Sequence, residues 1–490
     1  MDLSIPSIRF NNCTSYDALH FDTIDQNGVA YHVIAAKAGY TLGPAEPDGL
    51  ARLLSAETPA LLNQADTYYD DNIERSVRHE SDLAPYKPYC DVVVLGTAHA
   101  PGDKPRQQFD IALHVQLPDS PAELPEKPRP LNPMQSVSFA AQQEWLAKVE
   151  RARQTSSPGQ YLISKVLRVT GPRQLKKRSG VIRSVPAATQ LASLGLVRPA
   201  SWNLTSSTAI QTVAVRYEYA QGGSCWVEDG SPVAERVPQK YRLSPDAAAA
   251  WNSAGVSPIA TDACQTNPVG RGYVPAWYLL AARMESLPAP QIEYRHAGFS
   301  ADLFERASSG TAQLTPAGFG FVGRAWLPRR SYVGSIDSAC EWGAEDVPGL
   351  PSDFDFRYWN GAPEDQQCRF LLGHERIKLV NLCSAEDSAA TVDARGNTHL
   401  RFAVPPERLF LLGADHSGAI ATIPLSIDTV VVDTDALTVE LTYRTCLVAD
   451  GVLDEVRLYS AATPEQLIRL SEWELANLPE STPLESSSAL

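Results

Sequence analysis

The sequence predicts a mainly β protein of the α+β type, with a large antiparallel, sandwich-like sheet body, short helices and long irregular loops. Many apolar residues alternate with polar ones, which is the two-residue period of a half-buried β-strand. Others form short apolar runs, which are typical of buried strands. Thirty-seven prolines and thirty glycines among 490 residues imply frequent turns and few long helices. An apolar fraction of 44% is ample for a large core.

Strands are predicted first along the N-terminal part of the chain. Val29–Lys37 has the composition of a buried strand. Asp91–Ala98 and Phe109–Gln116 read as two strands around a polar turn at Pro101–Arg106, so we expect a hairpin there. A proline- and glutamate-rich linker follows. Ser136–Gln154 then has a helical apolar spacing.

The remaining chain is mostly strand. Tyr161–Thr170 has strand composition, and Gln211–Tyr219 alternates cleanly. Ser244 and Pro245 are typical of a helix start, with Ser as the N-cap. Further strands are predicted at Arg376–Leu382, His399–Val404, Ser426–Val432, Leu437–Arg444 and Glu455–Tyr459.

These elements predict one large domain with additions. Residues 1–450 form the β-rich domain, with a helical insertion at about 118–160. Residues 451–480 form a C-terminal helical segment, because Thr463-Pro-Glu-Gln466 is a capping box. The serine-rich residues 481–490 are expected to be a disordered tail.

Charge and composition exclude several classes of partner. A net charge of -15 argues against nucleic-acid binding, which depends on Lys and Arg at phosphates. No stretch approaches the ~18 apolar residues of a membrane span, and no signal peptide is visible at Met1–Pro6. The eight cysteines contain no C-x-x-C pair, so we expect reduced thiols in a cytoplasmic protein.

The stretch Pro316–Gln367 concentrates glycine, proline, aromatic and arginine residues, which predicts irregular loops anchored by large rings. Gly318–Gly323 matches G-x-G-x-x-G, but a proline precedes it and Pro328 prevents a following helix, so no nucleotide site is expected. The candidate partner-binding residues are Arg271, Arg324, Trp326, Arg329, Arg357, Tyr358 and Trp359.

No catalytic or cofactor signature is recognisable. The histidines form neither H-x-H nor H-E-x-x-H, so no metal site is predicted. There is no G-x-S-x-G elbow and no phosphate-binding loop. The acidic residues Asp353, Asp355, Glu364 and Asp365 offer carboxylates for hydrolysis, although turn residues of this kind are common. The residues alone therefore favour binding over catalysis.

Five segments, in this order, carry a family resemblance: Glu80–Pro88, Asn267–Tyr273, Pro316–Arg329, Phe354–Gln367 and Asp428–Asp435. In them the chain resembles a bacterial family of unknown function that is encoded beside type VI secretion effectors. The similarity runs from about Arg9 to Arg444, and Leu117–Gln160 departs from it. The resemblance implies a cytoplasmic adaptor or chaperone without catalytic activity, which holds a cognate effector and helps to load it onto the VgrG/PAAR spike. Leu117–Gln160 and the segment after Thr463 are expected to bear on effector choice.

Two rival functions stay open at this point. The first is a hydrolase that works with carboxylates such as Asp355 and Glu364, which requires both groups to face one pocket. The second is a structural component of the spike itself.

Overall fold

A computed structural model describes residues 5–117, 160–178, 201–252, 258–335, 350–369, 371, 373–415 and 420–461. The predicted insertion at about 118–160, the helix after Thr463 and the tail at 481–490 lie outside these residues, apart from the flanking strand ends. Within them, strands predominate and helices are short, which confirms the mainly β fold class.

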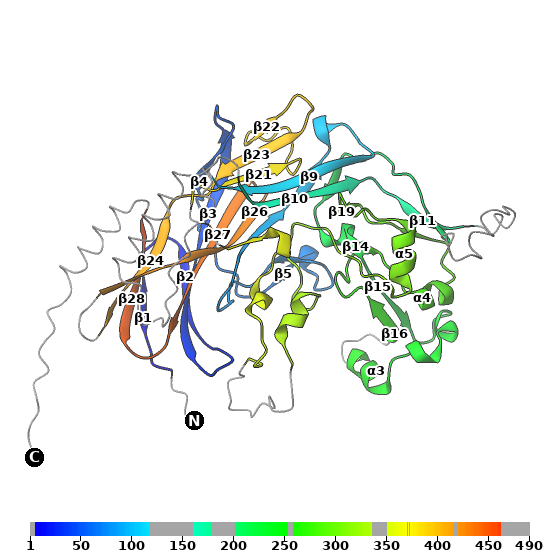
Figure 1. The fold of residues 1–490 in the computed structure, drawn as a ribbon, viewed down its shortest axis with the longest axis horizontal. Coiled ribbons are helices and arrows are strands. Elements are labelled where there is room, and N and C mark those ends of the chain that lie inside the picture. The colour runs from blue at the N-terminus through cyan, green and yellow to red at the C-terminus, as the bar shows by residue number, and fades with distance from the viewer. Residues whose placement is uncertain are drawn as a thin grey trace, which may run out of the picture.

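The largest sheet has seven strands and forms the centre of the molecule (Figure 1). Its main path is β2 (Asp17–Ile24), β3 (Ala30–Ala45), β27 (Thr438–Val448), β26 (Ser426–Asp433), β7 (Cys90–Leu95) and β20 (Gln367–Cys368), with β4 (Ala51–Ser55) beside β3. All pairs are antiparallel except β26 with β7. All six residues of β7 are buried, as its unbroken apolar run predicts.

A six-stranded sheet packs near the first. Its order is β19 (Ile292–Tyr294), β10 (Tyr161–Thr170), β9 (Gln108–Gln116), β21 (Arg376–Val380), β23 (Thr398–Ala403) and β22 (Ala390–Val392). Leu113 and Phe402 of this sheet share one hydrophobic core with Val92 and Val430 of the seven-stranded sheet. The two sheets therefore bury apolar faces together, as in a sandwich.

A four-stranded sheet lies at one end of the molecule (Figure 1). It contains β1 (Arg9–Asn12), β28 (Leu453–Ala461), β24 (Arg408–Asp415) and β25 (Ile420–Pro424), in that order. β28 pairs with both β1 and β24, and its Val456 and Leu458 enter the main core. The strand expected at Glu455–Tyr459 is therefore present, and residues 453–461 of the segment expected to be helical belong to this sheet.

The helices gather at the opposite end, around small sheets and separate cores (Figure 1). They are α3 (Pro245–Asn252), α4 (Ala276–Ala281) and α5 (Ala301–Ser308), and Ser244 caps α3 as predicted. The small sheets there contain β11 (Gln174–Lys177) with β12 (Trp202–Leu204) and β18 (Ser286–Pro288), β14 (Gln221–Gly222) with β17 (Arg271–Gly272), and β15 (Ser224–Glu228) with β16 (Pro258–Ala263). Two further small sheets pack on the main body: β5 (Thr67–Tyr68) with β6 (Val77–His79), and β8 (Thr97–His99) with β13 (Thr212–Ala214). No helix among the described residues is long and apolar enough to cross a membrane.

Two predicted strand arrangements were wrong. Asp91–Ala98 and Phe109–Gln116 form no hairpin, because β7 and β9 belong to different sheets. The first run breaks at Gly96, where φ is 136° and an added Cβ would lie 2.0 Å from the Thr434 hydroxyl oxygen. Gln211–Tyr219 is a strand only at β13, after which Tyr217–Tyr219 forms a 3-10 turn, η4, with the Tyr217 side chain buried.

The strands expected at Ser426–Val432 and Leu437–Arg444 are present, and they pair as the β26–β27 hairpin. At its turn the Asp433 carboxylate accepts hydrogen bonds from the backbone N–H groups of Asp435 and Ala436. Asp433 therefore stabilises the turn.

Candidate functional site

The loops of Pro316–Gln367 lie against one face of the seven-stranded sheet. Val93 of β7 and Val431 of β26 contact Phe321 and Ala362 in a hydrophobic cluster of their own. The described parts of this stretch are anchored by buried rings, as predicted, including Phe319, which is fully buried. Its short helical turns are η7 (Arg329–Val333), η9 (Phe356–Trp359) and η10 (Glu364–Gln366).

Arg329 joins three segments from inside these loops. Its guanidinium donates to the Glu80 carboxylate and to the backbone carbonyls of Val322 and Tyr358, and its side chain is only 3% exposed. Arg329 was predicted as a partner-binding residue. The structure instead uses its planar fork to bind loop carbonyls, so it is not available to a partner.

A second set of buried charges surrounds Asp82, two residues after Glu80. The Lys37 ammonium lies 2.8 Å from the Asp82 carboxylate, and the Arg444 guanidinium lies 2.6 Å from Asp428. Arg444 also donates to the Asp82 carbonyl at 2.7 Å. Burial raises the pKa of Asp82, but Lys37, the Asn63 backbone N–H and Arg444 together outweigh burial, so the pKa falls below the usual range. These contacts fasten the Glu80–Pro88 segment to β3 and β27.

Lys87 and Asp91 form the next buried pair. The Lys87 ammonium lies 2.9 Å from Asp91. Burial is the largest single effect and lowers the pKa of Lys87, but the carboxylates of Asp91, Asp428 and Glu80 together outweigh it, so the pKa rises. Asp91 also accepts from the Asn360 side chain and from the backbone N–H of Gly361 and Ala362. β7 thereby fixes the loop that follows η9.

Three more predicted residues contribute to packing. Trp326 is buried edge-on against Tyr217, with 5.5 Å between ring centroids. Arg324 pairs with Asp66 at 3.2 Å and lies over the Trp359 ring. Arg271 belongs to β17, where it stacks on Tyr219 and donates to Gln291. Trp326 is therefore buried inside the molecule, whereas Arg271 is half-buried and holds Tyr219 and Gln291 together.

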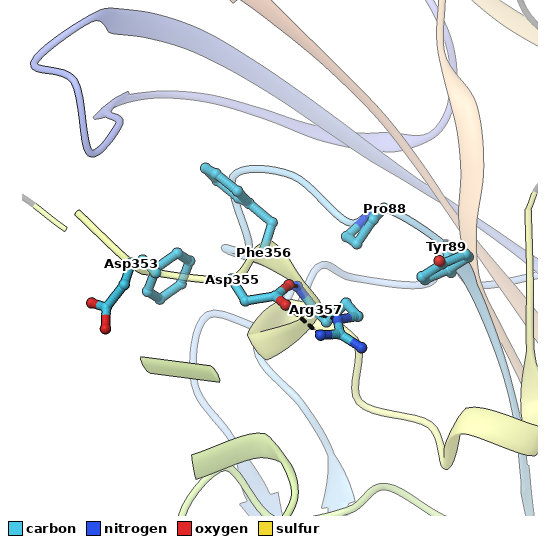
Figure 2. Close-up of a pocket in the computed structure, with 7 residues that line it drawn as sticks. Pro88, Tyr89, Asp353, Asp355, Phe356 and Arg357 are labelled. Atoms are coloured by element: carbon cyan, nitrogen blue, oxygen red, sulfur yellow. Dashed lines mark hydrogen bonds and ion pairs between the residues drawn. The ribbon is translucent and has the colours of Figure 1, made fainter. Parts of the chain in front are cut away.

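An exposed depression opens beside η9. Its volume is about 520 Å³, and it is lined by Pro88, Tyr89, Asp353, Phe354, Asp355, Phe356 and Arg357 (Figure 2). Arg357 binds Asp355 at 2.6 Å and stacks over Tyr332. Tyr86, which is 47% exposed, meets the Phe356 ring edge-on. We call Tyr86, Tyr89, Phe356 and Arg357 the aromatic patch.

Of the predicted partner-binding residues, only Arg357 lines the depression, and Tyr358 and Trp359 follow it half-buried on η9. Two of the candidate carboxylates, Asp353 and Asp355, line it as well. Sequence reasoning missed Tyr86 and Tyr89. The signal was present in Tyr86-Lys-Pro-Tyr89, where two large rings stand three residues apart at the end of the Glu80–Pro88 segment.

The four candidate carboxylates accept hydrogen bonds from different neighbours. Asp353 bonds Ser335, Asp355 bonds Arg357 and Glu364 bonds the Tyr332 hydroxyl. The hydrogen bond from Arg357 holds the pKa of Asp355 below its usual range. A carboxyl that stays ionised cannot serve as a general acid.

Asp365, the fourth carboxylate, binds a buried lysine of the six-stranded sheet. The Lys165 ammonium of β10 lies 2.8 Å from Asp365 and 2.7 Å from the Gln366 amide oxygen. Burial lowers the pKa of Lys165 to about 8, with Asp365 opposing the shift. Gln366 donates onward to the carbonyls of Val92 and Phe319, so these contacts link both sheets to the loops.

The role of Arg329 is tested by a change that keeps its charge. Arg329→Lys should lower the free energy of unfolding by about 2–4 kcal/mol, because an ammonium cannot reproduce the fork of contacts to Glu80 and two carbonyls. The exposed neighbour Arg330 is the matched control, and Arg330→Lys should change stability by less than about 0.5 kcal/mol. Equal effects in urea unfolding would contradict this assignment.

Lys165 predicts a pH dependence of stability. Its folded pKa of about 8 is below the ordinary value of 10.5, so the unfolded chain binds the proton more tightly. This destabilises the fold below pH 8, and the penalty fades as pH rises toward 10.5. Relative to Lys165→Met, the wild type should gain about 2 kcal/mol between about pH 7 and 9.5 in urea unfolding. A constant difference across that interval would refute the shift.

Comparison with known proteins identifies a family but no individual relative. The profile of a family described as "Uncharacterized protein conserved in bacteria (DUF2169)" matches residues 27–122 and 141–444. No curated protein and no solved structure shows a significant match. The gap at 123–140 is narrower than the expected departure at Leu117–Gln160, so much of that segment is family sequence. The chain belongs to this uncharacterized bacterial family.

Proposed function

We propose that this protein is a non-catalytic adaptor, or chaperone, that binds a cognate type VI secretion effector and helps to load it onto the VgrG/PAAR spike. The proposed role in type VI secretion is supported by the five family segments in their fixed order. Binding to another protein is supported by the aromatic patch. In this proposal the protein works in the cytoplasm, needs no cofactor and binds neither nucleic acid nor membrane.

The chemistry of the patch is that of a protein-binding centre. Tyrosine and arginine are enriched where interfaces carry most of their energy, because they combine large contact areas with hydrogen-bonding groups. Tyr86 and Tyr89 are 47% and 38% exposed. They lie on either side of Lys87 in the chain, and Lys87 forms a buried ion pair with Asp91. The Asn360 side chain also donates to the Tyr89 carbonyl at 2.9 Å. A surface held in this way loses little conformational entropy when a partner binds.

The carboxylates beside the patch favour binding over hydrolysis. A hydrolase that uses two carboxylates needs one of them protonated at the working pH. Asp355 has a lowered pKa because it accepts from Arg357, and Glu364 is engaged by Tyr332. Asp355 and Arg357 instead present both signs of charge at the edge of an aromatic surface, which favours a partner of complementary pattern.

The test is capture of the effector encoded by the neighbouring gene. Tyr86→Ala combined with Tyr89→Ala should weaken the Kd by about 30-fold or more, since even one central interface ring contributes about 2 kcal/mol. Tyr161→Ala is the matched control, because Tyr161 is 52% exposed and does not line the depression. It should bind the effector as the wild type does.

Two results would contradict the proposal. Unchanged effector affinity in the double variant, with an unchanged melting curve, would remove the patch from the interface. Recovery of the protein in the secreted fraction together with VgrG would instead identify a structural component of the spike.

A further inference from the structure

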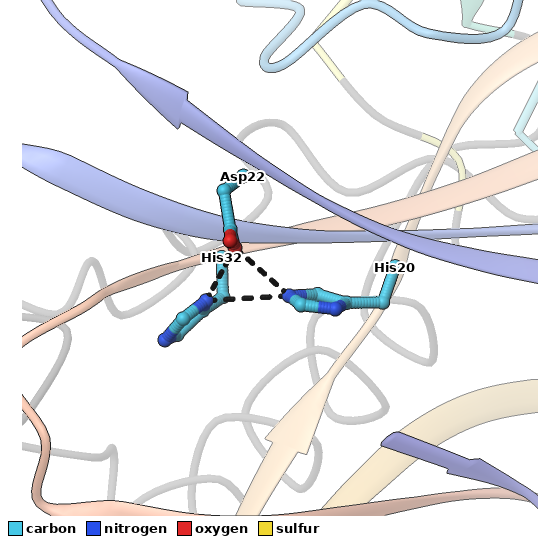
Figure 3. Close-up of side chains that lie close together, drawn as sticks. All are labelled: His20, Asp22 and His32. Atoms are coloured by element: carbon cyan, nitrogen blue, oxygen red, sulfur yellow. Dashed lines mark hydrogen bonds and ion pairs between the residues drawn. The ribbon is translucent and has the colours of Figure 1, made fainter. Parts of the chain in front are cut away.

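We propose that His20, Asp22 and His32 form a binding site for one divalent transition-metal ion, with zinc as the best fit. The three residues lie on the hairpin of β2 and β3, far along the chain from the loops described above. In the β2–β3 register Asp22 lies directly opposite His32, and His20 is two residues from Asp22 on the same strand. All three side chains therefore project from one face of the hairpin, as Figure 3 shows.

The donor atoms converge on one point. Nε2 of His20 lies 3.2 Å from Nδ1 of His32 and 3.1 Å from Oδ1 of Asp22, and the last two atoms are 2.6 Å apart. Ligands at about 2.0–2.1 Å from a tetrahedral zinc are separated by about 3.3 Å. Two of the three separations are close to this value. A small rotation of the Asp22 carboxylate, which is 38% exposed, would bring the third to it.

Hydrogen bonds among the three side chains cannot satisfy all three contacts at once. A neutral imidazole places one hydrogen on one of its two nitrogens, and a carboxylate oxygen only accepts. If both converging nitrogens carry hydrogens for Asp22, two N–H groups face each other across 3.2 Å. If only one does, one of the three contacts brings two lone pairs together. A single cation at the centre is attractive to all three atoms at once.

The donor set and its exposure also suit a metal ion. Two imidazoles and one carboxylate are the donor set of several zinc sites that keep a fourth position for water. His32 is buried, whereas Asp22 is partly exposed, so one side of the group faces solvent.

The site lies on β2, the outermost strand on the main path of the seven-stranded sheet. A metal shared by β2 and β3 would cross-link this strand to its neighbour in a way that backbone hydrogen bonds alone do not. The group is not recognisable from local motifs, because the sequence contains neither H-x-H nor H-E-x-x-H. The pattern is His20-x-Asp22 on one strand and His32 on the next, and it becomes visible only with the strand register.

The experiment titrates Zn²⁺ into the full-length chain after chelator treatment, using a chromophoric competitor and, separately, Co²⁺ absorption. We expect one ion per chain with a Kd below about 1 μM, a tetrahedral Co²⁺ spectrum and a higher Tm with metal. His20→Ala and Asp22→Asn should each weaken binding by about 100-fold and abolish the Tm increase. His114→Ala is the control, because that half-buried histidine bonds Ser164 on another sheet.

Absence of a saturable one-to-one site in the wild type would overturn the proposal. Equal loss in His114→Ala, or full binding in both His20→Ala and Asp22→Asn, would do the same. His20 and Asp22 are partly exposed, so their variants should keep the wild-type circular dichroism spectrum and report on the metal alone. If either variant unfolds, the Co²⁺ spectrum of the wild type decides, since only nitrogen and oxygen ligands in tetrahedral geometry fit this group.

Discussion

Arg329 and Glu80 are both removed from water, and neither charge can stay buried without the other. This pair connects the Glu80–Pro88 segment to the Pro316–Arg329 loop, and the Tyr358 carbonyl brings in the loop of η9. Further along, Lys87 and Asp91 repeat the same principle against β7. Because every partner is needed to neutralise another, these ion pairs favour one arrangement of the loop segments that carry them.

The buried ion pairs determine which arginines near the loops are left on the surface. The chain carries many arginines near the loops, but Arg329 and Arg444 bind carboxylates and carbonyls inside. Arg357 remains outside with Tyr86 and Tyr89, around a depression in a rigid frame. A binding protein needs such a frame more than it needs reactive groups, since a pre-arranged surface pays less entropy on association. The adaptor proposal follows from this division between buried ion pairs and exposed rings.

The sequence predicts local structure well and long-range pairing poorly. The β26–β27 hairpin and the Ser244 cap depend on near neighbours, so both were predictable. The pairing of β7 with β26 joins residues far apart in the chain, and no local pattern distinguishes it from a hairpin with β9. The same limit applies to the site. The arginine-rich loops were located correctly, but the role of Arg329 depends on Glu80, which lies 249 positions away. The His20 group needed the register of β2 and β3.

The central claim is that buried ion pairs hold an exposed aromatic patch on which a partner effector docks. Hydrogen–deuterium exchange of the full-length chain, alone and with the product of the neighbouring effector gene, tests it most directly. The account predicts slow exchange at Gly361 and Ala362 in both states, because Asp91 accepts their backbone N–H groups. It predicts new protection on complex formation at residues 86–89 and 355–358. Protection confined to other segments, or fast exchange at Gly361 and Ala362 in the free chain, would contradict the account.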